Sequence, residues 1–511
     1  MSRARTFWAS GLHAGALLRE RAGSGGRLWS KLPPLRSVMF VIGLLMVSLF
    51  LGLVSVMLGD IVAVKPVFFV ALPALIVVAF TFFLSPMALV VAIMLVRAGG
   101  DPIFAGTQLG GGAGLGAVLN LALIGLAAML VMRDPARVPR AAWWACIPFL
   151  TMIFVSVPYA PQPMEAIRPA LAQLSTFAVF ILAFVLVDDF KSLDKVLRLI
   201  VASSVPVVAQ SLLAIARHDS YAVQYIIDAA AAGRYAAPLP HPNILAFYVV
   251  LVIGVVFYLL KRQRSTASRP LQMVSVCYLL VLFVVLFATK TRSAWVAAML
   301  LFLLHGLFVE KRYLVYLVIA AVASMAIPDI RDRVMDLTQG NEVVQYARLN
   351  SFAWRKVVWT SGLSWMSPSH YLFGYGAGSF QFYFTTFYPQ DGNGVGFPAH
   401  SVPVQMFFEQ GLPGLLSFVW LFLSCARMMF PLARRELLGG VLFLALLLTY
   451  LVVSASDNML AYLVYNWYFW LLVGAACAVA MRGDLKGGEV APAGRRGHMV
   501  NQDIAHGGAP Q

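Results

Sequence analysis

Long apolar segments alternate with short polar segments along most of the chain. Each apolar run is close to the roughly 20 residues that cross a bilayer as a helix. The ten-residue alternation of an outer-membrane barrel is missing. The pattern predicts an all-α polytopic membrane protein with about 12–14 transmembrane helices. The fourteen predicted spans are 37–58, 66–82, 84–97, 115–132, 141–158, 171–187, 195–216, 241–260, 271–289, 291–309, 312–327, 400–425, 437–454 and 459–481.

The helix count depends on residues 66–97, a stretch of 32 residues without an internal charge. We divide it at Leu84-Ser85-Pro86, because proline breaks a helix and favours a turn. Fourteen spans place both termini in the cytoplasm, together with 26 of the 38 Lys and Arg residues. This distribution obeys the positive-inside rule, which a single span over 66–97 would violate at the N-terminus.

The span pattern divides the chain into five parts. Residues 1–36 form a basic cytoplasmic tail, and 37–327 hold transmembrane helices 1–11. Residues 328–399 form one large periplasmic loop. Residues 400–481 hold transmembrane helices 12–14, and 482–511 form a cytoplasmic tail whose Gly-, Arg- and Pro-rich composition predicts disorder.

Composition agrees with a membrane protein. The chain is 60% hydrophobic and 12% charged, with a mean hydropathy of +0.81, whereas soluble domains are about 25% charged. The net charge of +16 is concentrated in short loops. We therefore expect contacts with membrane lipids and no nucleic-acid partner.

Thr291-Arg292-Ser293 starts a predicted span on the periplasmic side. The free N–H groups of a helix N-terminus favour anions, and Lys290 and Arg292 add two cations. The segment is a candidate phosphate cradle. The alternative is a pair of interfacial anchors beside a Thr or Ser helix cap.

Arg234 precedes another span, with Pro238, Pro240 and Pro242 between it and Asn243. The prolines predict an extended segment that carries the arginine back over the mouth of the helix. A rigid arginine there can grip a diphosphate through two hydrogen bonds. The alternative is a stiff loop with a solvated arginine.

The large loop carries two further features. Arg348 and Arg355 are seven residues apart, so that on a helix they share one face; the alternative is a helix that contacts anionic lipid. Leu372-Phe-Gly-Tyr-Gly-Ala-Gly-Ser-Phe380 predicts a sharp backbone path and not a nucleotide loop. Its aromatic neighbours are candidates for a sugar acceptor groove or for interfacial anchoring; they are Tyr375, Phe380, Tyr383 and Tyr388.

His400 opens the span after the loop and is the candidate general base, because the unperturbed pKa of histidine is near neutrality. The alternative is a structural histidine. Glu409 lies nine positions further on, about half a turn away in azimuth, so the two form no dyad on one straight helix. The periplasmic carboxylates stand singly. We expect a metal-independent site of Arg and His that uses no cofactor.

The sequence Phe397-Pro-Ala-His-Ser-Val-Pro-Val-Gln-Met-Phe-Phe-Glu-Gln-Gly411 resembles the His-[Asn/Ser/Phe]-x-x-Leu-x6-Gly signature of the O-antigen ligase and Wzy-type polymerase superfamily. His400, Ser401 and Gly411 match, and Val404 replaces the usual Leu.

Three further motifs occur in the order of that family: Arg234 with Pro242-Asn243, Thr291-Arg292-Ser293-Ala, and the stretch from Arg348 through Trp354 to Phe380. The resemblance covers about 225 to 425.

The resemblance implies a GT-C-like glycosyltransferase at the periplasmic face of the bacterial inner membrane, with a glycan on undecaprenyl diphosphate as its donor. Arg234 and Arg292 would hold the diphosphate, and His400 would deprotonate the acceptor. Lys290, Arg348, Arg355, Asn243, Ser401 and Glu409 complete the expected substrate-binding residues.

Family members differ in their acceptor. We favour polymerisation of O-antigen or exopolysaccharide repeats; the alternative is a ligase that transfers glycan to lipid A core or to protein. Other polysaccharide assembly proteins are further expected partners. A transporter or flippase without chemistry is a distant alternative, because it needs polar residues along its spans, which here are almost free of charge except for His305.

Overall fold

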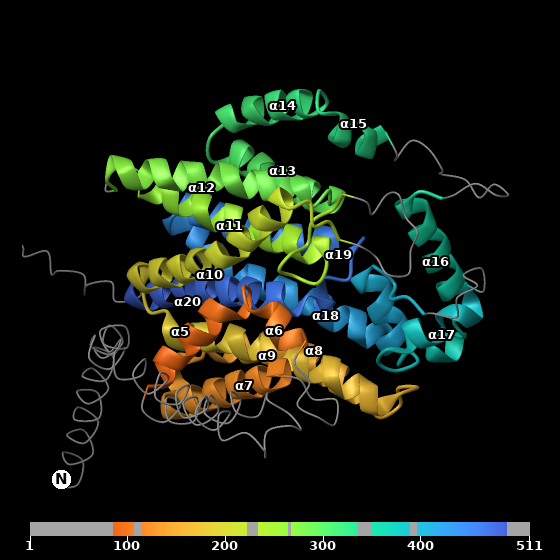
Figure 1. The fold of residues 1–511 in the computed structure, drawn as a ribbon. Coiled ribbons are helices and arrows are strands. Elements are labelled where there is room, and N and C mark those ends of the chain that lie inside the picture. The colour runs from red at the N-terminus through yellow and green to blue at the C-terminus, as the bar shows by residue number, and fades with distance from the viewer. Residues whose placement is uncertain are drawn as a thin grey trace, which may run out of the picture.

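The computed structural model describes residues 85–106, 115–221, 233–263, 267–335, 349–388 and 396–487. These residues form helices and connecting segments without a strand, and the chain is an all-α polytopic membrane protein (Figure 1). The helices are α5 Pro86–Arg97, α6 Asp101–Gly106, α7 Leu115–Arg133, α8 Arg140–Val155, α9 Pro163–Leu186, α10 Phe190–Ala216, α11 Pro242–Arg262, α12 Arg269–Ala288, α13 Arg292–Phe308, α14 Arg312–Ser324, α15 Pro328–Met335, α16 Ser351–Trp365, α17 Ser379–Phe387, α18 Val402–Arg435, α19 Leu437–Ser454 and α20 Leu463–Gly487, with short 3-10 turns at Pro135–Arg137, Pro368–His370 and Met459–Ala461.

Every predicted span within the described residues coincides with a helix. The first two spans, 37–58 and 66–82, lie outside these residues. The predicted break before Pro86 is present, because α5 begins there directly after its N-cap Ser85. Among the described helices, eight are long and apolar enough to cross a bilayer, and four shorter apolar helices accompany them.

Helices α9 and α10 begin at Pro163 and Phe190, before the predicted starts at 171 and 195, and two predicted helix ends are also wrong. Helix α18 continues to Arg435, beyond the predicted end at residue 425, because the basic residues of its last turn remain helical. Helix α20 continues to Gly487, so the tail expected from residue 482 does not begin there. Both errors arise because a hydropathy window ends where the apolar residues end, whereas the backbone hydrogen bonds continue.

The outer surface of the bundle is apolar. Only 17% of the apolar window of α12 is buried, and Met273, Val274 and Leu280 are each more than 60% exposed. A soluble protein would not expose such a continuous apolar surface. These side chains therefore face lipid.

Helices α11 and α20 form the centre of the bundle. Their apolar windows are 89% and 94% buried, as expected for helices that are hydrophobic on every side. Gly474 of α20 lies against α9, where a Cβ atom would be 2.5 Å from the Phe180 carbonyl oxygen. Small residues at such crossings let membrane helices approach closely.

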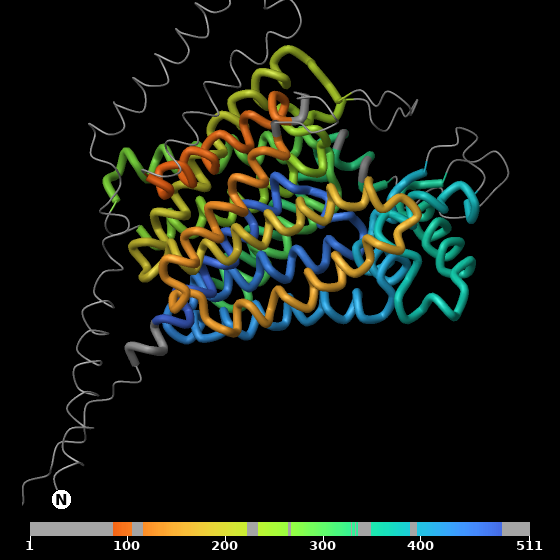
Figure 2. The backbone as a smooth tube through the Cα atoms, turned by 90° about the horizontal axis from the view of Figure 1, so that it is seen from below, coloured from red at the N-terminus to blue at the C-terminus, as the bar shows by residue number. Residues whose placement is uncertain are grey.

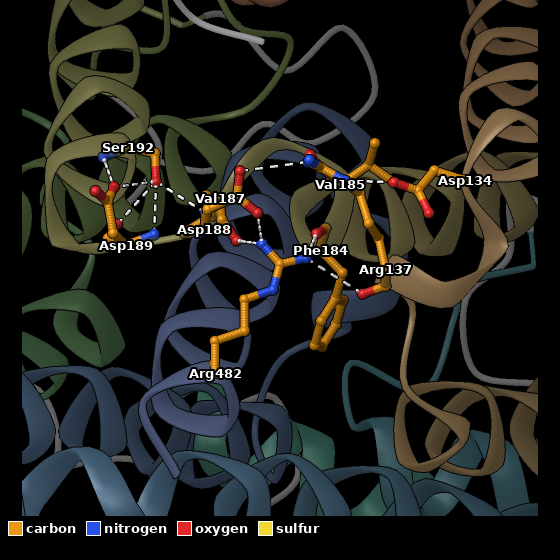
Figure 3. Close-up of polar contacts among 9 residues, drawn as sticks. All are labelled: Asp134, Arg137, Phe184, Val185, Val187, Asp188, Asp189, Ser192 and Arg482. Carbon is orange, nitrogen blue, oxygen red and sulfur yellow. Dashed lines mark hydrogen bonds and ion pairs between the residues drawn. The ribbon is translucent and has the colours of Figure 1, made fainter. Parts of the chain in front are cut away.

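Arginines and carboxylates join the helices at one end of the bundle, which we call the ion-pair end. Arg482 of α20 donates to the carbonyls of Phe184 and Val187 at the end of α9 and to the carboxylate of Asp188 (Figure 3). Arg137 donates to the Val185 carbonyl at 2.8 Å. The two guanidinium groups satisfy carbonyls that the last turn of a helix leaves unpaired.

Further ion pairs lie at the same end. Lys261 Nζ is 2.6 Å from Glu310, between α11 and the start of α14. Arg262 Nη1 is 2.9 Å from Asp194 of α10. These cations belong to the side that the charge pattern predicts to be cytoplasmic.

The opposite end, which we call the loop end, carries a small helical subdomain. Helices α16 and α17 lie beyond the end of the bundle in both views (Figures 1 and 2). Their core contains Val358, Phe380 and Phe384, and it packs on Phe408 in the first turns of α18. His400, which precedes the N-cap of this helix, is therefore held between the subdomain and the bundle.

We expect Arg482→Gln to destabilise the protein by about 2 kcal/mol or more, because it removes charge-assisted hydrogen bonds and leaves carbonyls at the end of α9 unpaired. The thermal unfolding temperature of the detergent-purified protein measures this. Arg427→Gln is the matched control, since Arg427 is exposed on α18 and surface changes cost about 0.5 kcal/mol or less. Equal unfolding temperatures for the two variants would contradict the prediction.

Candidate functional site

Three helices begin at the loop end and direct their N-termini toward one region. These helices are α11, α13 and α18, whose first residues are Pro242, Arg292 and Val402. Each N-terminus carries unpaired N–H groups and a partial positive charge. An anion is therefore stabilised at this end even before side chains are considered.

Arg234 is fixed over the start of α11 by three hydrogen bonds. Its Nε donates to the Thr289 carbonyl at 3.0 Å. Its Nη2 donates to Asn243 Oδ1 at 2.7 Å and to Thr291 Oγ1 at 3.0 Å. The proline-rich segment thus carries the arginine back to the helix mouth, as the sequence predicts. The solvated arginine of the alternative interpretation does not occur.

Asp457 anchors this network from the connection between α19 and α20. The residue is fully buried, and its Oδ2 accepts from Asn243 Nδ2 at 2.8 Å. Tyr462 and the backbone N–H of Asn458 donate to its other oxygen. The Asn243 amide therefore binds protein groups on both sides, so that Asn243 positions Arg234. Sequence analysis did not single out Asp457, because its contact with Asn243 joins residues 214 positions apart along the chain.

The hydrogen bonds of the Thr291 segment differ from those of the helix cap that the sequence suggested. The Thr291 hydroxyl makes no cap to its own helix and instead joins Arg234 and Asn243. Arg292 Nη2 donates to Ser351 Oγ at 2.7 Å, so it connects α13 with the first residue of α16. Lys290 Nζ would lie 3.4 Å from a Cβ atom at Gly233. Lys290 therefore lies beside the Arg234 segment, and Arg292 lies beside the start of α16.

His400 occupies a left-handed backbone conformation with φ of 48°, directly before Ser401, the N-cap of α18. The neighbouring Ala399 carbonyl accepts from Trp359 Nε1 at 2.6 Å, and the Trp354 ring lies 6.1 Å from the imidazole. Non-glycine residues in this conformation are uncommon and cluster at functional sites. Burial, followed by the charge of Arg355, lowers the pKa of His400 to about 4. His400 is therefore neutral at neutral pH.

His241 is a second histidine of this region that sequence analysis did not select. It caps α11, and its Nδ1 accepts from the Asn243 N–H at 3.1 Å. Burial lowers the pKa of His241 to about 4, and the charges of Arg234, His400 and Arg355 act in the same direction while Asp457 opposes them. These interactions show that groups from the loop subdomain and the bundle converge here. No sequence motif distinguishes His241 from an ordinary helix cap.

The expectation for Arg348 and Arg355 on one helix face is wrong. Asn350 is the N-cap of α16, where its side chain accepts from the N–H groups of Phe352 and Ala353, and the helix begins only at Ser351. Arg348 lies outside the described residues. Arg355 is half-buried on α16 and makes no hydrogen bond or ion pair within the described part of the chain.

The glycine-rich segment packs on a break in α18. Gly411 has φ of 68° and ψ of −163°. Around it the Phe408 and Glu409 carbonyls accept from Tyr375 and Gly376, at 3.0 and 2.8 Å. A Cβ atom at Gly374 or Gly411 would lie within 2.5 Å of the opposing backbone. The alternate glycines therefore provide the sharp backbone path that the sequence predicts.

Glu409 and Ser401 have surroundings different from those expected of ligands. The Glu409 carboxylate accepts from Gln405 Nε2 at 3.0 Å and from the backbone N–H groups of Gly378 and Phe380. Glu409 thus holds the glycine-rich segment. Ser401 is buried as the N-cap of α18.

The four aromatic candidates for an acceptor groove separate into two pairs. Phe380 and Tyr388 are buried in the core of the loop subdomain and have no surface for stacking a sugar. Tyr375 and Tyr383 are only partly buried, and both pack on Trp365. The expectation is therefore wrong for the first pair and stays a prediction for the second.

Carboxylates, histidines and cysteines do not gather at the loop end as metal ligands. Among the described residues, no three such side chains lie together in a way that would hold a metal ion. The charged groups that do gather are arginines and histidines with one buried carboxylate. This arrangement is suited to binding an anion and to accepting a proton on a neutral imidazole.

Comparison with known families agrees with the sequence resemblance. Residues 277–419 match the model of a family described as O-antigen ligase, which supports membership in the O-antigen ligase/Wzy-type family. The match runs from α12 into α18 and includes Arg292, Arg355 and His400, whereas Arg234 and Asn243 lie upstream of it. No curated protein sequence matches the chain. The family indicates a ligase- or polymerase-type membrane function.

We expect Gly376→Ala to destabilise the protein far more than Gly378→Ala. Both glycines have positive φ, 93° and 76°, which costs a residue with a Cβ atom about 1–2 kcal/mol. At Gly376 the Cβ atom would also lie 2.5 Å from Ala160 Cα, whereas at Gly378 nothing lies within 4 Å. The thermal unfolding temperatures of the purified variants measure the difference. Similar losses for the two would show that the close approach to Ala160 is unimportant.

Proposed function

We propose that this member of the O-antigen ligase/Wzy-type family is a glycosyltransferase that polymerises O-antigen or exopolysaccharide repeats carried on undecaprenyl diphosphate. One observation supports this more than any other. Asn243 binds both Arg234 and the His241 ring and is itself anchored by Asp457, while the charge of Arg355 acts on both His241 and His400. The family match, which covers His400, points to the same chemistry.

Arg234 and Arg292 bind the diphosphate in this proposal. A guanidinium that is already fixed by hydrogen bonds needs little reorganisation when charge develops on a leaving group, and Arg234 is fixed in this way. Lys290 and Arg292 are the two sequence neighbours of Thr291, which itself binds Arg234. The N-termini of α11 and α13 add favourable dipoles for the same anion.

His400 accepts the proton of the acceptor hydroxyl. The hydroxyl oxygen attacks the anomeric carbon, the bond from that carbon to the diphosphate oxygen breaks, and undecaprenyl diphosphate leaves with the electron pair. The imidazole becomes an imidazolium and later returns its proton to solvent. Diphosphate is a good leaving group, so that fixed cations, a base and correct positioning suffice without a metal.

The reaction takes place at the periplasmic face of the inner membrane. The positive-inside rule supports this orientation, because the ion-pair end carries most of the basic residues. The apolar outer surface of the bundle accommodates the polyprenyl chain in the bilayer. Arg355, which has no hydrogen-bonded partner among the described residues, is suited to bind the acceptor or donor glycan.

Ligation is the second candidate function. The description of the matched family, O-antigen ligase, favours it. The donor and the proton transfer are unchanged, and the acceptor hydroxyl belongs to lipid A core. The two functions therefore differ in the acceptor whose hydroxyl His400 deprotonates.

We expect Arg234→Ala, Arg292→Ala and His400→Ala each to reduce glycan transfer about 100-fold or more, as loss of a transition-state donor does. The variants are expressed in a strain that lacks the gene, and surface glycans are compared by gel after equal membrane accumulation is verified. Lys356→Ala is the matched control, because this lysine is exposed on α16 beside Arg355. Wild-type glycan length in all three variants would refute the assigned roles.

The same gels distinguish the two functions. Single repeats that remain attached to lipid A in the deletion strain indicate a polymerase. Polymer that accumulates on the lipid carrier and is missing from lipid A indicates a ligase.

The pH dependence tests the role of His400 as base. Its pKa is lowered from 6.5 to about 4, so the imidazole loses its basic form only as the pH falls through that value. We expect kcat/KM to stay constant from about pH 7.5 down to about pH 5.5 and to fall near pH 4. Tryptophan fluorescence at each pH verifies that the protein is folded. A midpoint near 6.5 would contradict the assignment.

A further inference from the structure

His241 presents one ring nitrogen to its own helix and the other away from it. Nδ1 accepts from the Asn243 N–H at 3.1 Å as the cap of α11. A neutral imidazole that accepts through Nδ1 carries its proton on Nε2. The cap therefore fixes the tautomer, and Nε2–H is a hydrogen-bond donor on the side of the ring opposite to the helix.

The position of the ring is fixed as well. Tyr221 packs against it edge to face, with ring centroids 5.4 Å apart, and the backbone N–H of Tyr221 donates to the Arg234 carbonyl at 2.6 Å. His241 and Arg234 also share Asn243, whose N–H binds the imidazole and whose Oδ1 binds the guanidinium. The two side chains are thus held as one unit.

We propose that the Nε2–H of His241 donates a hydrogen bond to the diphosphate of the lipid-linked donor, beside the guanidinium of Arg234. This inference rests on the proposed function and adds a residue to its diphosphate site. Within the described residues nothing accepts from Nε2, so a phosphoryl oxygen takes the place of water there.

A neutral donor is suited to this position. Burial and the charges of Arg234 and Arg355 disfavour a positive charge on His241, so the ring binds the diphosphate as an imidazole and keeps its proton. A fixed neutral imidazole stabilises developing negative charge without a further cation. The hydrogen bond from the imidazole orients the diphosphate. Because it adds no positive charge, the undecaprenyl diphosphate product is held less tightly than it would be by a further cation.

The test measures binding of undecaprenyl diphosphate, without a glycan, to the purified full-length protein. His241→Asn keeps the helix cap, because asparagine is among the best N-cap residues, but its shorter side chain cannot reach where Nε2 lies. We expect its affinity to fall about tenfold or more, as for loss of a hydrogen bond to a charged group. His218→Asn is the matched control, since His218 is exposed at the end of α10 with φ of 58°, a conformation that asparagine tolerates.

The outcomes separate this inference from the proposed function. Equal affinities of the wild-type protein and the His241→Asn variant for the lipid would refute the role of His241 and would not affect the proposed function. Wild-type protein that does not bind undecaprenyl diphosphate would refute the proposed donor itself.

A second replacement removes the hydrogen-bond donor at Nε2 and leaves the cap at Nδ1 unchanged. Histidine methylated on Nε2, introduced at position 241, keeps the Nδ1 acceptor and the ring but has no donor. It should bind the lipid as weakly as His241→Asn, with an unchanged unfolding temperature. Wild-type affinity in this variant would overturn the proposal.

Discussion

The hydrocarbon region of a bilayer contains no water, and this constraint places every charged group of the bundle. A polar group left unpaired there costs several kcal/mol. The charged groups of the described helices therefore gather toward the two ends. At the ion-pair end, arginines pair with carboxylates and with the carbonyls that end α9. At the loop end Arg234 is hydrogen-bonded to uncharged groups and Arg355 has no hydrogen-bonded partner among the described residues, which suits the anionic donor that we propose.

The loop end keeps its cations together by means of one buried carboxylate. Asp457 binds Asn243, and Asn243 in turn binds Arg234. A buried charge is tolerated only when it is paired and hydrogen-bonded, and this chain of contacts meets that condition for Asp457 without neutralising Arg234 directly. The guanidinium thus stays charged and immobile, which is what a phosphate-binding group requires.

The sequence predicts the helices of the bundle well, because the length of an apolar run depends only on residues that are neighbours in the sequence. It also selects Arg234, Arg292 and His400 as candidates, because their motifs lie beside predicted helix ends. Asp457 and His241 were not selected, because the role of each depends on a partner that only the fold brings near. Arg348 and Arg355 were placed on one helix by periodicity, and the cap at Asn350 overrides that pattern. Glu409 is expected from the sequence to bind substrate, whereas in the structure its carboxylate accepts hydrogen bonds from the backbone of the glycine-rich segment.

The first turns of α18 before the break at Gly411 contact both neighbours: Phe408 packs on the loop subdomain, whereas Val402 and Met406 belong to the core of the bundle. Further hydrogen bonds join the subdomain to the bundle, from Arg292 to Ser351, from Asn458 to Gln405 and from the Ala377 N–H to the Ser156 carbonyl. The proposed base and the arginines are therefore fixed relative to one another before a substrate binds, which is the preorganisation that transition-state stabilisation requires.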